Sequence, residues 1–486
     1  GTVDDPNLIL RRVTLSGNKA SGSSGTSTIN GATVSNGCGG GMYLQHGEID
    51  VTNVTMQNNY AQVNGGAINN HQGFVDIWGC IIGGSGYYVD NLTDGGTGKG
   101  NKAGQHGGGI YTNEGDIDIE DIVETDNGQL VRYESQVTYN EAGQNGGGIN
   151  THSGTITIND DEDDDQIEIA YNKAYKGGGM YANAGTIQAH NANIHDNTAT
   201  LNGGAVNNHA GDIILYGGSL SNNTAEQGHG GGAYTYVGDI DLFQFPKTKL
   251  SDVTLNDGTK VYNNIALKNG GAFNNHTGRV DVRHATLYNN TASQGNGGAI
   301  FCEGPHANAN RGLGFTIRLL CSDLVQNKTR GQDGTATDPT GRGGGVYLKY
   351  GSLYAHYSNI LNNEATISGG GLNNHEGQIL LYGCDVIGNK ALGERGGGIF
   401  VKQGDITTGP SAERDNNPPT SSKATLVQSN TAHIDGGGIY NEQGNINLNG
   451  DLVGGDNASL GNIAQTGDGG GVTVTSRKAR SWSSRY

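Results

Sequence analysis

The fold is decided by the stretch GGGMYLQHGEIDVTNVTMQNNYA at residues 39–61. A run of glycines is followed by short stretches in which apolar residues alternate with polar ones, and an Asn-x-Ala element closes the copy. The stretch GGAVNNHAGDIILYGGSLSNNTA at residues 203–225 repeats this pattern. Alternation with period two indicates β-strands. The stretches are too short and too often broken by glycine to form helices, so the pattern predicts a β-structured repeat protein.

The repeat extends along the whole chain, and its shortest copies lie 26 to 27 residues apart. Fourteen glycine blocks start near Gly39, Gly65, Gly107, Gly146, Gly177, Gly203, Gly230, Gly270, Gly297, Gly343, Gly369, Gly396, Gly436 and Gly469. The closing asparagines are Asn18, Asn59, Asn101, Asn140, Asn172, Asn197, Asn223, Asn264, Asn290, Asn327, Asn363, Asn389, Asn430 and Asn462. Fourteen concordant copies make this a strong signal of a solenoid.

Each copy has room for three short strands, which make one turn of a triangular coil. Each strand then pairs in parallel with its equivalent one turn on, and the handedness of parallel connections predicts a right-handed coil. Glycine runs suit a tight corner that excludes a Cβ, and the asparagines should stack as an internal ladder. The residue after each glycine block should form a core stack, because a slip of one residue would turn it outward. This column is Met42, Ile68, Ile110, Ile149, Met180, Val206, Ala233, Phe273, Ile300, Val346, Leu372, Ile399, Ile439 and Val472.

We therefore predict an all-β chain: a right-handed parallel β-helix of about 14 rungs of three strands. It forms a single domain over residues 1–476, followed by a basic tail at 477–486. Surface-loop insertions are predicted near 83–100, 120–136, 159–166, 243–260, 304–314, 328–342 and 408–424.

Composition excludes several classes of protein. Glycine is abundant, at 87 of 486 residues, but proline is scarce, at seven, which argues against collagen. The net charge of −18 opposes nucleic-acid binding and is compatible with divalent cations. No apolar stretch approaches the roughly 18 residues of a membrane span. The sequence starts at Gly1 without Met, as expected for a processed form or an excerpt of a longer product.

The five cysteines do not form a zinc motif, because no Cys-x-x-Cys spacing occurs. Cys302 and Cys321 flank a Gly/Asn-rich insertion, and one interpretation is that they pair. The alternative is that Cys38, Cys80, Cys302, Cys321 and Cys384 are all buried free thiols.

The GGAI blocks at 65–68 and 297–300, together with apolar-x-x-Asn closures, resemble the repeats of polymorphic outer-membrane proteins and related β-helix passenger domains. The resemblance covers nearly the whole chain, although the closing motif here usually has Leu, Ile or Val where that family has Phe. It implies a secreted, surface-displayed rod with an adhesive or structural role. A broader similarity is to pectin-lyase-like coils, which include polysaccharide-cleaving enzymes; the fold alone does not choose between these roles.

Two columns on the opposite face from the core stack are candidate binding residues. The residue two after the glycine block alternates between aromatic and Asn: Tyr43, Asn69, Tyr111, Asn150, Tyr181, Asn207, Tyr234, Asn274, Phe301, Tyr347, Asn373, Phe400 and Tyr440. Two residues later, the Asn rungs carry His71, His152, His209, His276 and His375. Outward rings every second rung, about 9.6 Å apart, suit stacking of a glycan or docking of a neighbouring rod. The alternative is mutual packing of large and small rungs. The histidines lie too far apart to share a zinc ion, so no metal site and no cofactor are predicted.

Two further motifs allow a functional and a structural interpretation. The acidic run at 159–165, which includes Asp160 to Asp165, suits either Ca²⁺ or a solvated charged loop. Gly228-His229-Gly230 matches the Gly-His-Gly of polygalacturonase-like coils, yet the paired Asp and Arg-x-Lys elements are missing at matching rungs. No Gly-x-Ser-x-Gly elbow occurs either. We predict no catalytic residues and therefore not an enzyme.

Asn-x-Ser/Thr sequons occur at Asn53, Asn91, Asn222, Asn275, Asn289, Asn327 and Asn457. Asn91 and Asn457 lie in predicted loops and are the best candidates for glycosylation. Asn327 belongs to the predicted ladder and should be inaccessible.

The two ends of the sequence are predicted to be uncapped parts of a coil turn. Exposed strand edges invite addition of further strands, so head-to-tail self-association into filaments is one hypothesis. The basic residues Arg477, Lys478 and Arg480, with Trp482, would dock on the next copy. The other hypothesis is that the coil continues beyond this sequence.

The sequence therefore favours an extracellular or cell-surface protein with a structural or adhesive role, with self-association and possible glycan partners. The alternative is a polysaccharide-binding or polysaccharide-cleaving coil of the pectin-lyase type.

Overall fold

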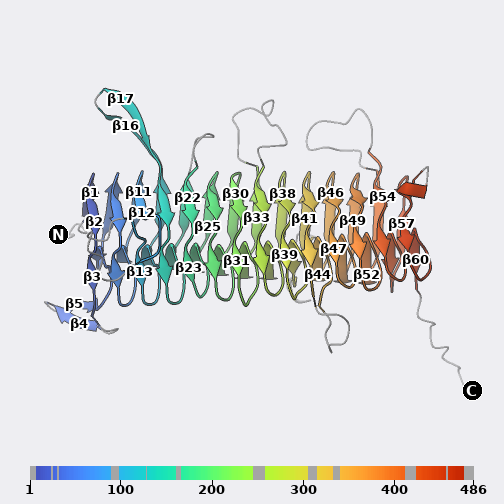
Figure 1. The fold of residues 1–486 in the computed structure, drawn as a ribbon, viewed down its shortest axis with the longest axis horizontal. Coiled ribbons are helices and arrows are strands. Elements are labelled where there is room, and N and C mark those ends of the chain that lie inside the picture. Colours follow the sequence, from blue (N-terminus) through green and yellow to red (C-terminus); the bar gives the residue numbers. More distant parts are fainter. Residues whose placement is uncertain are drawn as a thin grey trace, which may run out of the picture. The chain divides into compact units, whose positions relative to one another are not determined.

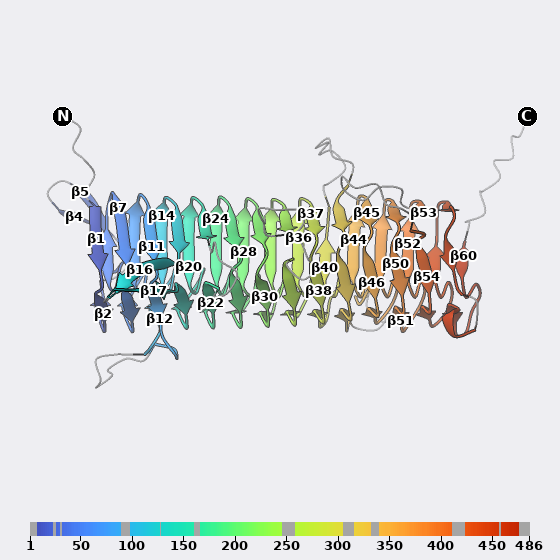
Figure 2. The same ribbon diagram turned by 90° about the horizontal axis from the view of Figure 1, so that it is seen from above.

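The computed structural model describes residues 7–22, 26–29, 32–88, 98–126, 128–159, 166–244, 258–304, 315–331, 340–410, 423–455 and 458–475. The chain divides into two compact units, Gly1–Ser293 (unit 1) and Gln294–Tyr486 (unit 2). Each unit is a right-handed parallel β-helix (Figure 1, Figure 2). The predicted fold class is confirmed. The boundary between the two units lies inside residues 1–476. That residues 1–476 form a single domain stays a prediction.

Among the described residues, four parallel sheets account for all strands except those of two antiparallel hairpins, and each kind of parallel sheet has 14 strands. Sheet 1 follows the glycine blocks: in unit 1 β6 Met42–Leu44, β10 Ile68–Gln72, β14 Ile110–Glu114, β20 Ile149–Ser153, β24 Met180–Ala184, β28 Val206–Ala210, β32 Ala233–Val237 and β36 Phe273–Thr277; in unit 2 β40 Ile300–Cys302, β44 Val346–Tyr350, β48 Leu372–Glu376, β52 Ile399–Gln403, β56 Ile439–Asn441 and β60 Val472–Val474.

Sheet 2 comes next in each turn. It comprises in unit 1 β1 Asn7–Arg11, β7 Glu48–Thr52, β11 Val75–Trp78, β15 Ile117–Glu120, β21 Ile156–Asn159, β25 Ile187–His190, β29 Ile213–Tyr216, β33 Ile240–Phe243 and β37 Val280–Arg283; in unit 2 β41 Ile317–Leu320, β45 Leu353–His356, β49 Ile379–Tyr382, β53 Ile406–Gly409 and β57 Ile446–Leu448.

Sheet 3 precedes the closing asparagines. It comprises in unit 1 β2 Thr14–Ser16, β8 Thr55–Gln57, β12 Ile81–Gly83, β18 Gln136–Thr138, β22 Glu168–Ala170, β26 Asn193–His195, β30 Ser219–Ser221, β34 Lys260–Tyr262 and β38 Thr286–Tyr288; in unit 2 β42 Asp323–Val325, β46 Asn359–Leu361, β50 Asp385–Ile387, β54 Leu426–Gln428 and β58 Leu452–Val453.

Sheet 4 amends the prediction of three strands per turn, because a fourth strand of two residues follows each closing Asn. These strands are in unit 1 β3 Lys19–Ala20, β9 Tyr60–Ala61, β13 Lys102–Ala103, β19 Glu141–Ala142, β23 Lys173–Ala174, β27 Thr198–Ala199, β31 Thr224–Ala225, β35 Ile265–Ala266 and β39 Thr291–Ala292; in unit 2 β43 Lys328–Thr329, β47 Glu364–Ala365, β51 Lys390–Ala391, β55 Thr431–Ala432 and β59 Ile463–Ala464. Two residues are too few to show the period-two alternation that marks a strand in a sequence.

The core of each unit is built from the inward residues of these strands. In β10 and β14, Ile68 pairs with Ile110, and the same register continues from rung to rung. Thirteen residues of the predicted core stack, from Met42 to Ile439, are at most 6% exposed; Val472 is partly exposed. The observed register is the one predicted from the residue after each glycine block. A slip of one residue would place these side chains in water.

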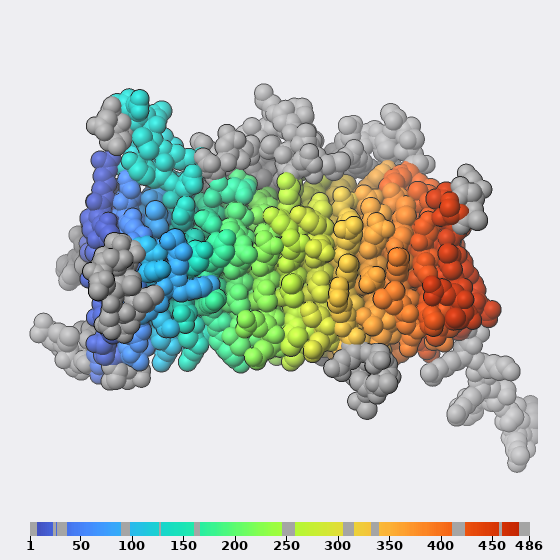
Figure 3. All heavy atoms as spheres, viewed as in Figure 1, coloured from blue at the N-terminus to red at the C-terminus, as the bar shows by residue number. Residues whose placement is uncertain are grey.

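The insertions differ in part from simple loops. Residues 120–136 contain an antiparallel hairpin of β16 Ile122–Asp126 and β17 Gln129–Tyr133, and Figure 3 shows its atoms (cyan) standing out from unit 1. A second hairpin, of β4 Thr26–Ile29 and β5 Ala32–Ser35, was not predicted. A short 3₁₀ helix spans Ala458–Leu460. The other predicted insertions contain residues outside the described part. Within the described residues, no helix is long and apolar enough to cross a membrane.

Candidate functional site

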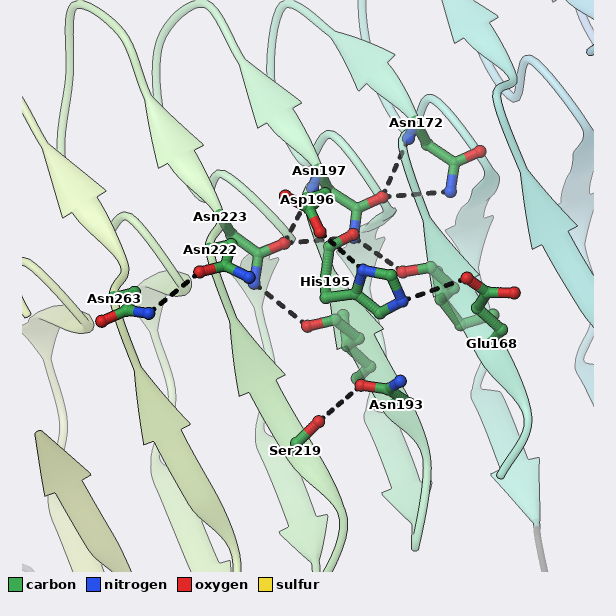
Figure 4. Close-up of polar contacts among 12 residues, drawn as sticks. Glu168, Asn172, Asn193, His195, Asp196, Asn197, Ser219, Asn222, Asn223 and Asn263 are labelled. Carbon is green, nitrogen blue, oxygen red and sulfur yellow. Dashed lines mark hydrogen bonds and ion pairs between the residues drawn. The ribbon is translucent and has the colours of Figure 1, made fainter. Parts of the chain in front are cut away.

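The closing asparagines form a hydrogen-bonded ladder within each unit, and Figure 4 shows part of the ladder of unit 1. The Nδ2 and the backbone N–H of Asn172 both donate to Oδ1 of Asn197, at 3.0 Å each. The Nδ2 of Asn197 donates in turn to Oδ1 of Asn223 at 3.1 Å and to the carbonyl oxygen of Ile169 at 2.7 Å. Twelve of the fourteen asparagines are fully buried, and only Asn18 and Asn462 are not. The ladder therefore joins successive turns and offers no surface to a ligand.

A second column of inward-facing asparagines was not predicted from the sequence. Asn70 Nδ2 donates to the carbonyl oxygens of Gly47 and Phe74, at 2.9 Å each, and so closes the corner between sheets 1 and 2. Its equivalents make the same pair of bonds in later rungs: Asn208, Asn275, Asn374 and Asn441. The signal was present as the second residue of each Asn-Asn pair in β10, β28, β36 and β48.

The outward aromatic column differs from the expected binding face. Tyr111, Tyr181, Tyr347 and Tyr440 are at most 7% exposed, and Tyr43 and Tyr234 are half-buried. The alternating Asn69, Asn150, Asn207, Asn274 and Asn373 are at most 3% exposed. These side chains point away from the core stack but are covered, so they present no open stacking surface.

These side chains are covered by the loop that precedes the strand of sheet 1. The covering residue lies five positions before the covered residue in the sequence. His106 stacks with Tyr111 at a ring distance of 6.1 Å, and His229 contacts Tyr234 at 6.4 Å. On an Asn rung, Asn207 Nδ2 donates to the carbonyl oxygen of Asn202 at 3.1 Å. In the sequence, a His lies five positions before a Tyr, or an Asn five positions before an Asn. The alternation of apolar and polar residues, on which the prediction rests, does not reveal this pairing.

Gly228-His229-Gly230 lies in the loop before β32. The Nδ1 of His229 accepts the backbone N–H of Asn269 at 3.3 Å, which ties one rung to the next. Burial is the main cause that lowers the pKa of His229 to about 4, followed by the charge of Lys268. His106 has a pKa of about 4 for the same main reason. Both rings are therefore neutral at physiological pH.

The histidine column lies on the surface. We define the outer ladder as the column of sheet 1 in unit 1 that contains Gln45, His71, Asn113, His152, Asn183, His209, Tyr236 and His276. His152, His209 and Tyr236 are exposed and the others are half-buried. The Tyr236 ring stacks with His209 at 5.2 Å and with His276 at 4.7 Å. In unit 2, Nε2 of His375 lies 2.6 Å from Nζ of Lys402.

His195 lies between two carboxylates (Figure 4). Its Nε2 lies 3.0 Å from Oε1 of Glu168, and its Nδ1 lies 2.7 Å from Oδ2 of Asp196. Burial lowers the pKa of His195, but the hydrogen bonds to both carboxylates outweigh it, so the pKa is raised. Both ring nitrogens therefore contact carboxylate oxygens within unit 1.

A carboxylate cluster lies on the outer face of sheet 2. One oxygen each of Glu48, Asp50 and Asp76 lies within 4.8 Å of the others, close enough to hold a cation. Burial, a hydrogen bond with Glu48 and the charge of Asp118 raise the pKa of Asp76 to about 7. Burial, followed by the charge of Glu48, raises the pKa of Asp50, and the charge of Arg11 offsets part of this rise. This cluster was not predicted. Asp50 and Asp76 lie in successive turns, and only the pairing of β7 with β11 brings them side by side.

We expect Asp76→Asn to stabilise unit 1 above pH 7. The pKa of Asp76 is higher in the folded chain, at about 7, than its ordinary value of 3.8. The folded state therefore binds the proton more tightly, and stability falls as pH rises from about 4 to 7. The gain at pH 8 should be about 1–2 kcal/mol, because solvent screens part of the repulsion. Urea unfolding at pH 5 and pH 8 measures it, with the exposed Asp468→Asn as control. An equal effect at both pH values would contradict the assignment.

The remaining predicted sites have the following positions. All five cysteines, including Cys302 and Cys321, are thiols that form no disulfide bond. Among the sequons, Asn275 and Asn327 are fully buried, and Asn222 and Asn289 are exposed. Asn91, Asn457, the acidic residues 160–165, and Arg477, Lys478, Arg480 and Trp482 lie outside the described residues.

The parallel β-helix with its glycine and asparagine columns places the chain among repeat proteins. Comparison with known families shows one specific similarity. Residues 53–71 and 284–303 match the model of the Chlamydia polymorphic membrane protein repeat. The chain thus carries repeats like those of the polymorphic membrane proteins, as the GGAI blocks predicted. Neither the curated proteins nor the solved structures compared with the chain contain a match.

Proposed function

We propose that this chain is a surface-displayed, non-enzymatic β-helix protein of the adhesin type. The observation that carries the proposal is the match to the polymorphic membrane protein repeat at residues 53–71 and 284–303. In the structure, both segments span the closing Asn, the two-residue strand and the glycine block. The likeness therefore concerns the elements that build each turn, and it supports an extracellular or cell-surface location.

The outer ladder is the face that we propose for partner binding. It is polar on every rung from Gln45 to His276 and exposed at His152, His209 and Tyr236, whereas no tyrosine of the column beside it is more than half-exposed. Side chains repeated at about 4.8 Å suit an extended partner that makes the same contact many times.

The proposal is tested with beads that carry the full chain, applied to cell surfaces and extracellular matrix. We expect retention of wild-type beads, and at least a severalfold loss with His152→Ala/His209→Ala/Tyr236→Ala. The control is His433→Ala, an exposed histidine of unit 2. If wild-type beads are not retained on any surface, the adhesive role is wrong.

We also propose head-to-tail association with a second copy. The outermost described turns leave inward-facing apolar residues exposed: Leu448 and Val474 in unit 2, and Val13 in unit 1. A further turn from another copy would bury them and pair the strand edges. Electron microscopy of undenatured protein should show filaments; single short particles at high concentration would contradict the proposal.

Polysaccharide cleavage is the second candidate function, and the Glu48, Asp50 and Asp76 cluster favours it. A carboxyl group with a pKa of about 7 beside two further carboxyl groups is the arrangement expected of a general acid. The full chain should then release reducing ends or unsaturated products from uronate-containing polysaccharides, and Asp76→Asn should abolish this. Wild-type product at the level of the blank would exclude this function.

A further inference from the structure

Two pairs of tyrosines stack between successive turns of unit 1. The rings of Tyr139 and Tyr171 have centroids 4.6 Å apart and planes inclined by 12°. The rings of Tyr262 and Tyr288 have centroids 4.8 Å apart and planes inclined by 7°. Each pair therefore places two phenol rings face to face at about the 4.8 Å spacing of neighbouring strands.

The backbone fixes the partners in both pairs. Tyr262 and Tyr288 are register partners in β34 and β38. Tyr139 and Tyr171 share a φ of 58°, and each directly precedes an asparagine of the buried ladder. The hydrogen bond between those two asparagines, at 3.1 Å, holds the two turns in register. The rings therefore face each other because of the fold itself and not through a flexible linker.

The four phenol rings are more accessible to an oxidant than most of the sulfur atoms of the chain. All four tyrosines are half-buried, so solvent reaches part of each side chain. The three methionines are at most 6% exposed, and four of the five cysteines are buried. Burial raises the pKa of Cys80 to about 11 and that of Cys384 to about 12, so both stay thiols, which react slowly with peroxide.

Stacked phenols can be joined by a balanced oxidation. A one-electron oxidant removes one electron from each ring, and each phenol releases its proton to water. The two tyrosyl radicals form a carbon–carbon bond between the positions next to their phenol oxygens. The hydrogen atom on each joined carbon then moves to the oxygen, which restores both phenols. Hydrogen peroxide takes up the two electrons and two protons through a peroxidase and becomes two water molecules.

We propose that Tyr139 with Tyr171, and Tyr262 with Tyr288, are sites of oxidative cross-linking, at which a peroxide and a peroxidase form dityrosine between successive turns. The partners are already positioned in the folded chain, which favours coupling within one molecule over coupling between molecules. Each cross-link closes a loop in the unfolded chain and should therefore stabilise the folded turns. The proposal goes beyond adhesion and does not depend on it.

The test exposes the full chain, at low concentration, to hydrogen peroxide and a haem peroxidase. We expect dityrosine fluorescence, a loss of two hydrogen atoms in mass per link, and cross-linked peptides that join Tyr139 to Tyr171 and Tyr262 to Tyr288. The double variant Tyr139→Phe/Tyr262→Phe keeps both ring stacks but should lower the intramolecular yield roughly tenfold or more. Treated wild type should unfold at higher urea than untreated protein, whereas the treated double variant should not.

The chain provides two controls. Tyr236 is 41% exposed, but its ring stacks with two histidines, so Tyr236→Phe should behave as wild type. In unit 2, Phe301 stacks with Tyr347 at 5.4 Å and Phe400 with Tyr440 at 5.5 Å. Each of these stacks has a single phenol, so neither should yield a cross-linked peptide.

Three outcomes overturn the proposal. Cross-links that form only between molecules, or mainly through Tyr236, would show that exposure and not stacking selects the tyrosines. Equal intramolecular yield from wild type and the double variant would exclude the two pairs. A urea midpoint that stays unchanged after complete cross-linking would show that the links do not hold successive turns together.

Discussion

Gly178→Ala is expected to lower the stability of unit 1 by about 3 kcal/mol or more. Gly178 is the second glycine of its block, and a Cβ there would lie 2.3 Å from the carbonyl oxygen of Gly204 and 2.6 Å from that of Thr198. Both atoms belong to backbone held in place by pairing between turns, so neither can move aside independently. All fourteen blocks have glycine at this second position. The midpoint of urea unfolding and the yield of folded protein measure the effect.

The neighbouring glycine provides the matched control. A Cβ at Gly179 would meet the carbonyl oxygen of Ala205 at 3.1 Å and Cγ of Asn197 at 3.3 Å. Other blocks already carry alanine at this third position, namely Ala67, Ala205, Ala272 and Ala299. Gly179→Ala should therefore cost less than about 1 kcal/mol. Equal destabilisation by both variants would show that close backbone approach is not the reason for the second glycine.

Asn197→Ala is expected to cost about 3–5 kcal/mol, because its amide connects three turns. The change removes the acceptor of two donors of Asn172, at 3.0 Å each. It also removes the donor to Asn223 at 3.1 Å and to the carbonyl oxygen of Ile169 at 2.7 Å. All these groups are buried, and each unsatisfied buried group costs about 1–3 kcal/mol. Hydrogen exchange should show the largest loss of protection in the turns of Asn172, Asn197 and Asn223.

Asn222→Gly is the control for the ladder. Asn222 directly precedes a ladder residue but is exposed and has a φ of 55°, a conformation that glycine adopts without strain. Its loss should change stability by less than about 0.5 kcal/mol. A similar loss in both variants would mean that burial of the ladder amides is not what stabilises the turns.

Local pattern was sufficient for the parts of the fold that repeat. The core stack from Met42, the glycine corners and the ladder through Asn197 each recur once per turn, and parallel pairing brings equal positions together. A column in the sequence therefore becomes a column in space. The hairpin at 122–133 has no such repeat, and its strand pairing was not predicted.

The sequence by itself determined the β-helix, its register and which residues face inward, since these depend on a period that short-range sterics enforce. Only the tertiary structure decided what is accessible outside. Tyr111 and His152 both point away from the core, but the loop at His106 covers Tyr111 and leaves His152 exposed. It also decided that Asp50 and Asp76 meet in adjacent strands and so raise the pKa of Asp76 to about 7. Exposure and charge coupling depend on neighbours that lie a full turn away, and no local period encodes them.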